Sequence, residues 1–246
     1  MAPGKERQSL SREDRQKRIL RDLFLAQDAQ KAYSFTSAYQ ISEGTLAADL
    51  DRLSAWLSSY HITLSRRPGL GIFLEGTEDA LRHAMVGYIC EMEDAKALMD
   101  VLHNEKQQLP AYLQGLRFAE RAALFRKLIL DAEAQLHSRF SDRGVLALCL
   151  YSALATERVR AGKTLSLPPE QLIRLQSLPT YPVAQNLAQQ LFQEANLPLS
   201  PDEIGFLAAN LSGAGVYSRP QRDLTENHEI QLRECVLLMT QRVEES

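Results

Sequence analysis

Apolar residues recur at intervals of three and four along most of the chain, so that they share one face when the chain is helical. The pattern begins near Ser11 and is clearest in two early groups: Ile19, Leu20, Leu23 and Phe24, then Leu46, Leu50, Leu53 and Leu57. Helices of this kind bury their apolar face against a neighbour. The pattern therefore predicts a mainly α-helical protein.

One region departs from the helical pattern. Residues 62–65 and 72–76 alternate between polar and apolar side chains, and they flank a turn that contains Pro68 and Gly69. Such a pair of short segments around a Pro/Gly turn predicts a β-hairpin. Because a helix over residues 42–59 comes directly before it, the sequence predicts a winged helix.

The helix over 42–59 turns its leucines inward and a different set of side chains outward. Ser42 is a favourable cap for its N-terminus. The outward set is Glu43, Gly44, Ala47, Ala48, Asp51 and Arg52, and the hairpin turn adds Arg66 and Arg67. A DNA-reading helix must fit the major groove, with donors near its N-terminus and cations at its flanks for phosphate.

This segment resembles the winged helix-turn-helix of Mga-like regulators, which occurs in tandem at the front of multidomain activators of sugar operons. The resemblance implies DNA contact by Ser42, Glu43, Gly44, Thr45, Ala48, Arg52, Arg66 and Arg67. Recognition helices of the family usually carry Arg or Lys where this chain has Ala47 and Ala48.

The charged residues of this domain give evidence both for and against DNA binding. The carboxylates of Glu43 and Asp51 would repel DNA phosphates, and on this face of the helix only the Arg52 guanidinium would attract them. A basic run near the N-terminus favours DNA: Lys5, Arg7, Arg12, Arg15, Lys17, Arg18 and Arg21. Runs of this kind are more often solvated faces than DNA clamps. Two hypotheses remain open: this domain contacts DNA, or it keeps the fold and serves as a dimerisation or spacer module.

The rest of the chain continues as helices. Thr77 can cap one long helix through Leu98. Five further helices are expected: four over 119–140, 142–161, 182–195 and 200–213, and a short one that begins at Pro168 and Pro169. We expect four parts: a winged domain over 1–77, connector helices over 78–117, a five-helix bundle over 118–217, and a linker with a terminal helix over 218–246. That terminal helix, over 229–243, would dock on the bundle, on another chain or on a further domain.

The bundle carries five short motifs in a fixed order. They are Arg139-Phe140-Ser141-Asp142, Tyr151 seven residues before Arg158, Gly162, Tyr181-Pro182-Val183-Ala184 and Asp202-Glu203-Ile204-Gly205-Phe206. Their order and spacing resemble the phosphotransferase regulation domain (PRD) of BglG-type antiterminators and activators. With the winged segment, the resemblance covers residues 12–215 and implies a PRD-containing transcription regulator.

In that family, a histidine in each of two helices accepts phosphate from the phosphocarrier protein or the enzyme IIB component of sugar transport, and the added charge resets a dimer interface. Tyr151 and Asn210 stand at those two positions. A phenol with a pKa of about 10 is a poor acceptor and an amide is none. We therefore expect no histidine phosphorylation there. Arg158 is retained, either to hold an anion or a carboxylate such as Glu157 or Glu203, or as an ordinary arginine at the edge of the core.

Composition adds little. A net charge of -3 gives no overall attraction to nucleic acid or to a membrane. Cys90, Cys149 and Cys235 are scattered among apolar residues, which indicates reduced thiols and a cytoplasmic protein. No apolar run reaches the length of a membrane span.

The motifs of enzymes are incomplete. Residues 160–164 resemble part of a phosphate-binding loop, but Glu157 takes the place of a required glycine. His61, His83, His103, His137 and His228 form no metal-ligand set. We expect no catalysis, no cofactor and no metal.

The sequence therefore predicts a regulator of a carbohydrate-utilisation operon that acts on DNA as a homodimer and meets phosphotransferase-system proteins through its PRD. The alternative is a dimerisation or interaction segment that does not contact DNA. RNA antitermination is less favoured, because that branch of the family has a small β-domain in place of the helix and wing.

Overall fold

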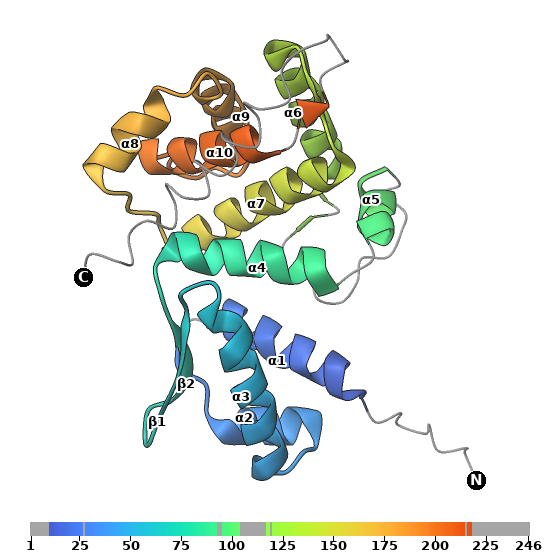
Figure 1. Cartoon of the computed structure of the whole chain (residues 1–246), viewed down its shortest axis with the longest axis vertical. Coiled ribbons are helices and arrows are strands. Elements are labelled where there is room, and N and C mark those ends of the chain that lie inside the picture. The colour runs from blue at the N-terminus through green and yellow to red at the C-terminus, as the bar shows by residue number, and fades with distance from the viewer. Residues whose placement is uncertain are drawn as a thin grey trace. The chain divides into compact units, whose positions relative to one another are not determined.

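The computed structural model describes residues 10–26, 28–92, 95–103, 117–118, 120–214 and 216–217. The chain divides into two compact units, Met1–Tyr88 and Ile89–Ser246. Both are mainly helical, as the periodicity predicts (Figure 1). Lys5, Arg7, the 218–227 linker and the terminal helix expected over 229–243 lie outside the described residues.

The N-terminal unit is a winged helix. Its elements are α1 (Arg12–Leu25), α2 (Ala32–Tyr39), α3 (Glu43–Ser58), β1 (Thr63–Arg67), β2 (Gly71–Glu75) and the greater part of α4 (Glu78–Met92). The two predicted groups of apolar residues form its core, since all eight side chains are buried. The hairpin projects from the helices in Figure 1.

The turn between α2 and α3 follows from local chemistry. Gln40 ends α2 in the left-handed conformation with φ 53°, and its N–H donates to the carbonyl oxygen of Thr36. The Ser42 hydroxyl then accepts a hydrogen bond from the backbone N–H of Thr45 at 3.1 Å. That bond satisfies a donor which the first turn of a helix leaves without an intrahelical partner, so α3 begins where the sequence predicts.

The hairpin is longer toward its tip than the sequence indicates. The antiparallel ladder runs from Thr63 opposite Glu75 to Arg67 opposite Gly71, so Arg66 and Arg67 belong to strand β1 and not to the turn. Gly71 has φ 129°, and a Cβ there would lie 2.6 Å from the carbonyl oxygen of Gln30. Only glycine allows this close approach.

The connection between the two units differs from the single long helix that the sequence predicts. Helix α4 ends at Met92 and a separate helix, α5 (Ala95–His103), follows; residues 93–94 lie outside the described residues. Tyr88 packs against Phe24 and Trp56, with ring centroids 6.3 and 6.1 Å away. Because of these contacts the first unit extends to Tyr88, past the expected boundary at residue 77.

The second unit contains the predicted five-helix bundle. Its elements after α5 are α6 (Ala122–Leu136), β3 (Arg139–Phe140), α7 (Asp142–Arg160), α8 (Pro169–Gln176), α9 (Tyr181–Glu194), α10 (Pro201–Gly213) and β4 (Val216–Tyr217). Helices α9 and α10 pack closely together, and α10 also contacts α7 and α8.

Helix α6 ends earlier than residue 140, where the sequence placed its end. His137 closes it at Leu136 by taking the left-handed conformation with φ 49°. The buried carboxylate of Glu133 then accepts hydrogen bonds from the N–H of Phe140 at 2.9 Å and from Arg139 at 2.7 Å. These bonds hold residues 139–140 as a short strand, which pairs with β4.

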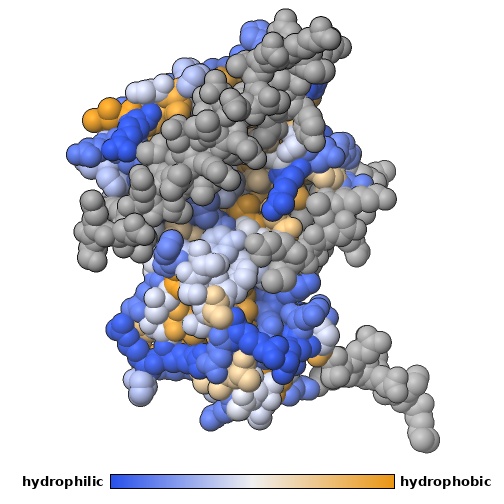
Figure 2. All heavy atoms as spheres, in the orientation of Figure 1, coloured by the Kyte–Doolittle hydropathy of each residue, from blue (hydrophilic) through white to orange (hydrophobic). Residues whose placement is uncertain are grey.

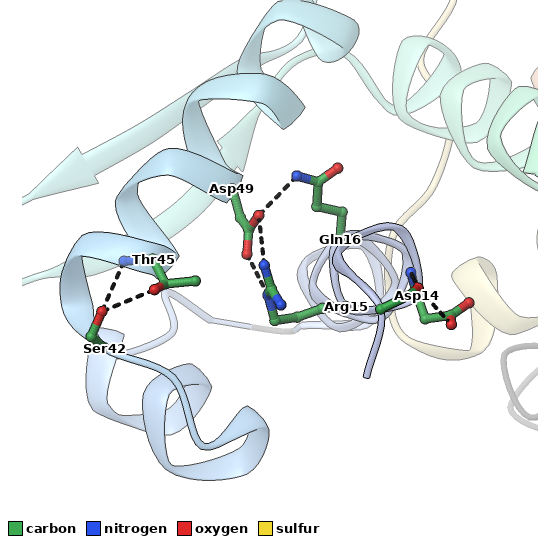
Figure 3. A network of polar contacts seen from close by, with 7 residues as sticks. Asp14, Arg15, Gln16, Ser42, Thr45 and Asp49 are labelled. Carbon is green, nitrogen blue, oxygen red and sulfur yellow. Dashed lines mark hydrogen bonds and ion pairs between the residues drawn. The ribbon is translucent and has the colours of Figure 1, made fainter. Parts of the chain in front are cut away.

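A buried polar contact joins α1 to α3 (Figure 3). Asp49 is 1% exposed, and it accepts hydrogen bonds from Arg15 Nε at 2.6 Å and from Gln16 Nε2 at 2.8 Å. Burial alone would raise the pKa of Asp49, but these hydrogen bonds and the Arg15 charge outweigh it, so the pKa lies below its ordinary value. Arg15, counted in the basic run, is thus a structural residue.

We expect Asp49→Asn to lower the free energy of unfolding of the N-terminal unit by about 2 kcal/mol, because it leaves the Arg15 guanidinium mostly buried without its carboxylate. Urea denaturation of the full chain, followed by Trp56 fluorescence, measures this effect. Trp56 is the single tryptophan of the chain and lies in α3 with Asp49.

Asp51→Asn is the matched control, because Asp51 lies in the same helix with its side chain 71% exposed. Its replacement should change the free energy of unfolding by less than about 0.5 kcal/mol.

The folded-state pKa of Asp49 is lowered, so its contribution to stability depends on pH. This contribution is complete above the unfolded-state pKa of about 3.9 and is lost as the pH falls through the folded-state pKa. Lowering the pH should therefore reduce the free energy of unfolding of the wild type more than that of Asp49→Asn. Equal effects of the two variants would contradict this assignment.

Candidate functional site

The outer face of α3 carries the side chains that the sequence assigned to it. Glu43, Gly44, Ala48, Asp51 and Arg52 are all exposed. The hydroxyls of Ser42 and Thr45 lie 2.9 Å apart, so both take part in capping the helix. On the side seen in Figure 2, hydrophilic residues cover most of this unit and the apolar patches between them are small.

A groove of about 450 Å³ separates α3 from the wing. Its lining comes from the start of α2, one side of α3 and the tip of the hairpin. Three cations line it, Lys31, Arg66 and Arg67, with one acid, Glu43. The structure thus brings one side of α3 and both wing arginines to one groove. Lys31 joins them without having been predicted.

Acidic side chains hold the wing arginines. Arg66 Nη2 lies 2.7 Å from the Asp51 carboxylate, and Arg67 Nη2 lies 2.7 Å from that of Glu75. The Arg67 guanidinium also lies over the Phe73 ring, 5.2 Å from its centroid. All four charged side chains are at least one third exposed, and exposed ion pairs contribute little. A phosphate can therefore replace either carboxylate at small cost.

The basic run divides between structural and exposed residues. Arg15 is held by Asp49, and Arg21 bonds to its neighbour Asp22 at 2.6 Å. Arg12 and Arg18 are exposed on the outside of α1. The run is therefore not a continuous cationic surface, because part of it stabilises the fold.

In the second unit, the two expected phosphoacceptor positions lie on α7 and α10, which contact each other. The Tyr151 ring of α7 packs edge to face on Phe206 of α10, with centroids 5.5 Å apart. The Asn210 amide donates to the carbonyl oxygen of Phe206 at 2.8 Å. The two positions therefore belong to one bundle, and the Asn210 side chain bonds to the backbone of its own helix.

The sequence offered Glu157 and Glu203 as carboxylates that Arg158 could hold, and each of the two has at least one contact in the bundle. Arg158 itself is half-buried on α7. Glu157 pairs with Arg160, and Glu203 is buried with its carboxylate 3.4 Å from the N–H of Leu165. Anion binding by Arg158 stays a prediction.

Arg121 is a buried cation that sequence reasoning missed. It lies before α6 with 6% of its side chain exposed and donates to the Thr156 hydroxyl. The carboxylates of Glu157 and Glu194 lie 3.7 and 3.5 Å from its guanidinium. The partners are 35 or more positions away in the sequence, so periodicity gives no signal for the contact.

Histidine and cysteine chemistry gives no further site. Burial lowers the pKa of His83, while burial raises that of the Cys149 thiol to about 12. Cys90 and Cys149 do not form a disulfide in the part of the chain that the structure describes. In the described part of the chain, no three His, Cys, Asp or Glu side chains gather as a metal site requires. His228 and Cys235 lie outside that part.

Comparison with known protein families accounts for both units. Residues 7–88 match the Mga helix-turn-helix domain and residues 126–214 match the PRD domain. The chain combines a Mga helix-turn-helix domain with a PRD. The family resemblance stated from the sequence is confirmed, and the match over 7–88 ends at the same residue as the first compact unit.

Two curated relatives are regulators from Bacillus subtilis (strain 168). The chain is 25% identical over 201 residues to the probable licABCH operon regulator, covering 82% of this chain and 30% of that protein. It is 20% identical over 206 residues to the transcriptional regulator ManR, covering 84% of this chain and 30% of that protein. The chain therefore spans less than a third of either relative. None of the helices in the described ranges has the length and apolar character to span a membrane.

We expect Arg121→Ala to lower the stability of the PRD by about 3 kcal/mol, because it removes a buried, bonded side chain. Arg121→Met should cost less, since methionine fills the space, Glu157 keeps Arg160 and Glu194 is 51% exposed. Thermal unfolding by far-ultraviolet circular dichroism measures both variants, with Trp56 fluorescence as the internal control for the other unit. Equal losses for both variants would show that the charge, and not the packing, is what the bundle needs.

Proposed function

We propose that this chain is part of a transcription regulator of a carbohydrate-utilisation operon, with its N-terminal domain contacting DNA through α3 and the wing. The observation that carries the proposal is the shared surface of α3, Arg66 and Arg67 on a helix-turn-helix frame. Both relatives are regulators by name, which supports it. The protein would act without catalysis, in the cytoplasm, as a homodimer.

The exposed N-terminal turn of α3 would enter the major groove, which admits an α-helix. Its backbone and the small side chains Gly44 and Ala48 allow close approach to base edges. Arg52, Arg66 and Arg67 would contact phosphates on the flanks, since they lie at the edges of the same face. The acids Glu43 and Asp51 keep the affinity modest, because each would lie close to the phosphate backbone.

The PRD would sense phosphotransferase-system proteins without phosphorylation at the two usual positions. The Tyr151 phenol and the Asn210 amide cannot replace a neutral imidazole as nucleophile. The packing of the Tyr151 ring on Phe206, and the bond of the Asn210 amide to the backbone of its own helix, support a structural role for them. Recognition would then depend on the surface of the bundle, with Arg158 as the candidate anion contact.

A second candidate is a dimerisation or interaction segment that does not contact DNA. The observation that favours it is the pairing of both wing arginines with carboxylates, Asp51 and Glu75, on the face that DNA would occupy. DNA-binding measurements on charge variants separate the two candidates.

We expect Arg66→Ala and Arg67→Ala each to weaken binding to promoter fragments from the neighbourhood of the gene. Each should also reduce the slope of log K against log salt by about 1, because one phosphate contact is lost. Asp51→Asn should act in the opposite direction, since it removes an acid from the face and releases Arg66. Fluorescence anisotropy of the full chain over a salt series measures all three variants.

Lys127→Ala is the control for these charge variants, because Lys127 is an exposed cation on α6 of the other unit. It should leave both affinity and slope unchanged. Binding that is indifferent to Arg66, Arg67 and Asp51, or no binding at all, would favour the interaction segment.

We expect incubation with phosphorylated phosphocarrier protein to leave the wild-type PRD unlabelled. Tyr151→His returns an imidazole to the half-buried position beside Phe206 and should allow labelling there. Transfer of radioactive phosphate, followed by mapping of the labelled peptide, measures both.

Asn210→Gln serves as the control, since it alters the second position without adding a nucleophile. Label on wild-type Tyr151 or His137 would contradict the altered switch. A Tyr151→His chain that stays unlabelled would contradict recognition by the carrier protein.

A further inference from the structure

We propose that the groove between α3 and the wing binds an acidic peptide segment of a partner protein. A large apolar side chain of the peptide would lie on the groove floor, and its carboxylates would bind the cations on the rim. The site goes beyond the proposed function and does not depend on it. A peptide bound there would cover one side of α3 and both wing arginines, so it would exclude DNA from the same face.

The floor of the groove is apolar. The groove runs between α3 and the hairpin, which contact each other and lie side by side in Figure 1. Ala32 and Ala47 are exposed on its sides, and Leu46, Leu50 and Ile72 complete the lining from the core. Sites that bind apolar groups have volumes of about 300–1,000 Å³ and a mostly apolar lining with a few polar groups. At about 450 Å³, this groove can hold a large apolar side chain.

The side of α3 that faces the groove brings no cation to it. Its lining residues are Glu43, Leu46, Ala47 and Leu50, which are one acid and three apolar residues. A sugar–phosphate strand is charged along its whole length, so it would gain nothing from this side and would be repelled by Glu43. An apolar side chain gains from the surface that it removes from water. The α3 side of the groove therefore favours an amphipathic ligand over a plain polyanion.

The cations of the groove come from the start of α2 and from the wing. They are Lys31, at the N-cap of α2, and Arg66 and Arg67 of β1. Both arginines already bind carboxylates of this chain, each with a distance of 2.7 Å from Nη2. These pairs are exposed and contribute little to stability. A carboxylate of a partner can therefore replace either one, because it offers the arginine the same charge-assisted hydrogen bonds.

The wing side of the groove is held in place before any ligand binds. The Lys31 ammonium donates to the carbonyl oxygens of Gly69 and Leu70, the latter at 3.1 Å. Gln30 and Ile72 exchange two backbone hydrogen bonds of 2.8 Å. A groove with one side fixed in this way loses little conformational entropy when a peptide enters it, and lower ordering costs increase affinity.

These features together specify the chemistry of the ligand. The floor requires an apolar anchor, and the three cations require acids close to that anchor. Neutral sugars and simple phosphates meet neither or only one of these requirements. Segments in which acidic and apolar residues alternate meet both, and such segments are often disordered until they bind.

The test compares two synthetic peptides of equal length and charge that carry a fluorescein label. One alternates Asp with Leu and the other alternates Asp with Ser. The full wild-type chain should bind the Asp–Leu peptide at least about tenfold more tightly, because that factor corresponds to the burial of one leucine side chain. Fluorescence anisotropy with no DNA present measures both dissociation constants.

Two variants locate the binding site. Ala47→Gln extends a polar side chain into the groove and should bring the ratio of the two dissociation constants toward one. Ala55→Gln is the matched control, because Ala55 is exposed on the same helix and does not line the groove, so it should keep the wild-type ratio. Arg66→Ala should weaken binding of both peptides by a similar factor of about threefold, since both use its charge. Trp56 fluorescence should confirm that all three variants are folded.

The outcomes separate this site from DNA contact. Equal wild-type affinity for the two peptides, or binding of neither, would overturn the peptide site and leave DNA contact untouched. A preference for the Asp–Leu peptide that survives in Ala47→Gln would also overturn it, because the anchor would then lie elsewhere. If that variant also binds promoter DNA more weakly than the wild type, the groove belongs to nucleic acid.

Discussion

The buried bond between Asp49 and Arg15 is the constraint on which the N-terminal domain depends. A carboxylate inside an apolar core is costly unless hydrogen bonds satisfy it, and Arg15 and Gln16 satisfy it from α1. The leucines on either side of Asp49 bury α3, but apolar packing alone would tolerate small rotations of the helix. The hydrogen-bonded Asp49 carboxylate tolerates smaller rotations of α3, because a rotation would break its bonds to α1. It therefore sets which residues of α3 face outward.

Helix positions follow closely from the sequence where local chemistry determines them. Ser42, Ser141 and Ser200 each cap a helix at the expected place, because the cap and the helix it stabilises are adjacent in the chain. The alternating segments around Pro68 likewise predicted the hairpin, and its ladder extends toward the tip by Arg66, Arg67 and Gly71. The spacing of the PRD motifs correctly brought Tyr151 and Asn210 into one bundle.

Contacts between distant parts of the chain could not be predicted in this way. Glu133 holds residues 139–140 as a strand after α6 has ended, and the packing of Tyr88 moves the first boundary past residue 77. Arg15 looked like a DNA contact because its carboxylate lies 34 positions away. Arg121 gave no signal for the same reason. The sequence shows where charges occur, but only the fold shows which of them are already satisfied.

The pairing of β3 with β4 brings the end of α10 close to the start of α7. Ala214 lies against Gly144 so closely that a Cβ on Gly144 would be 1.9 Å from its carbonyl oxygen, and Ser141 donates to the same oxygen. The exit of α10 is thus joined to the first turn of α7, the helix that carries Tyr151. A tilt of α7 would strain the contact between Gly144 and Ala214, so the first turn of α7 and the end of α10 are constrained to move together.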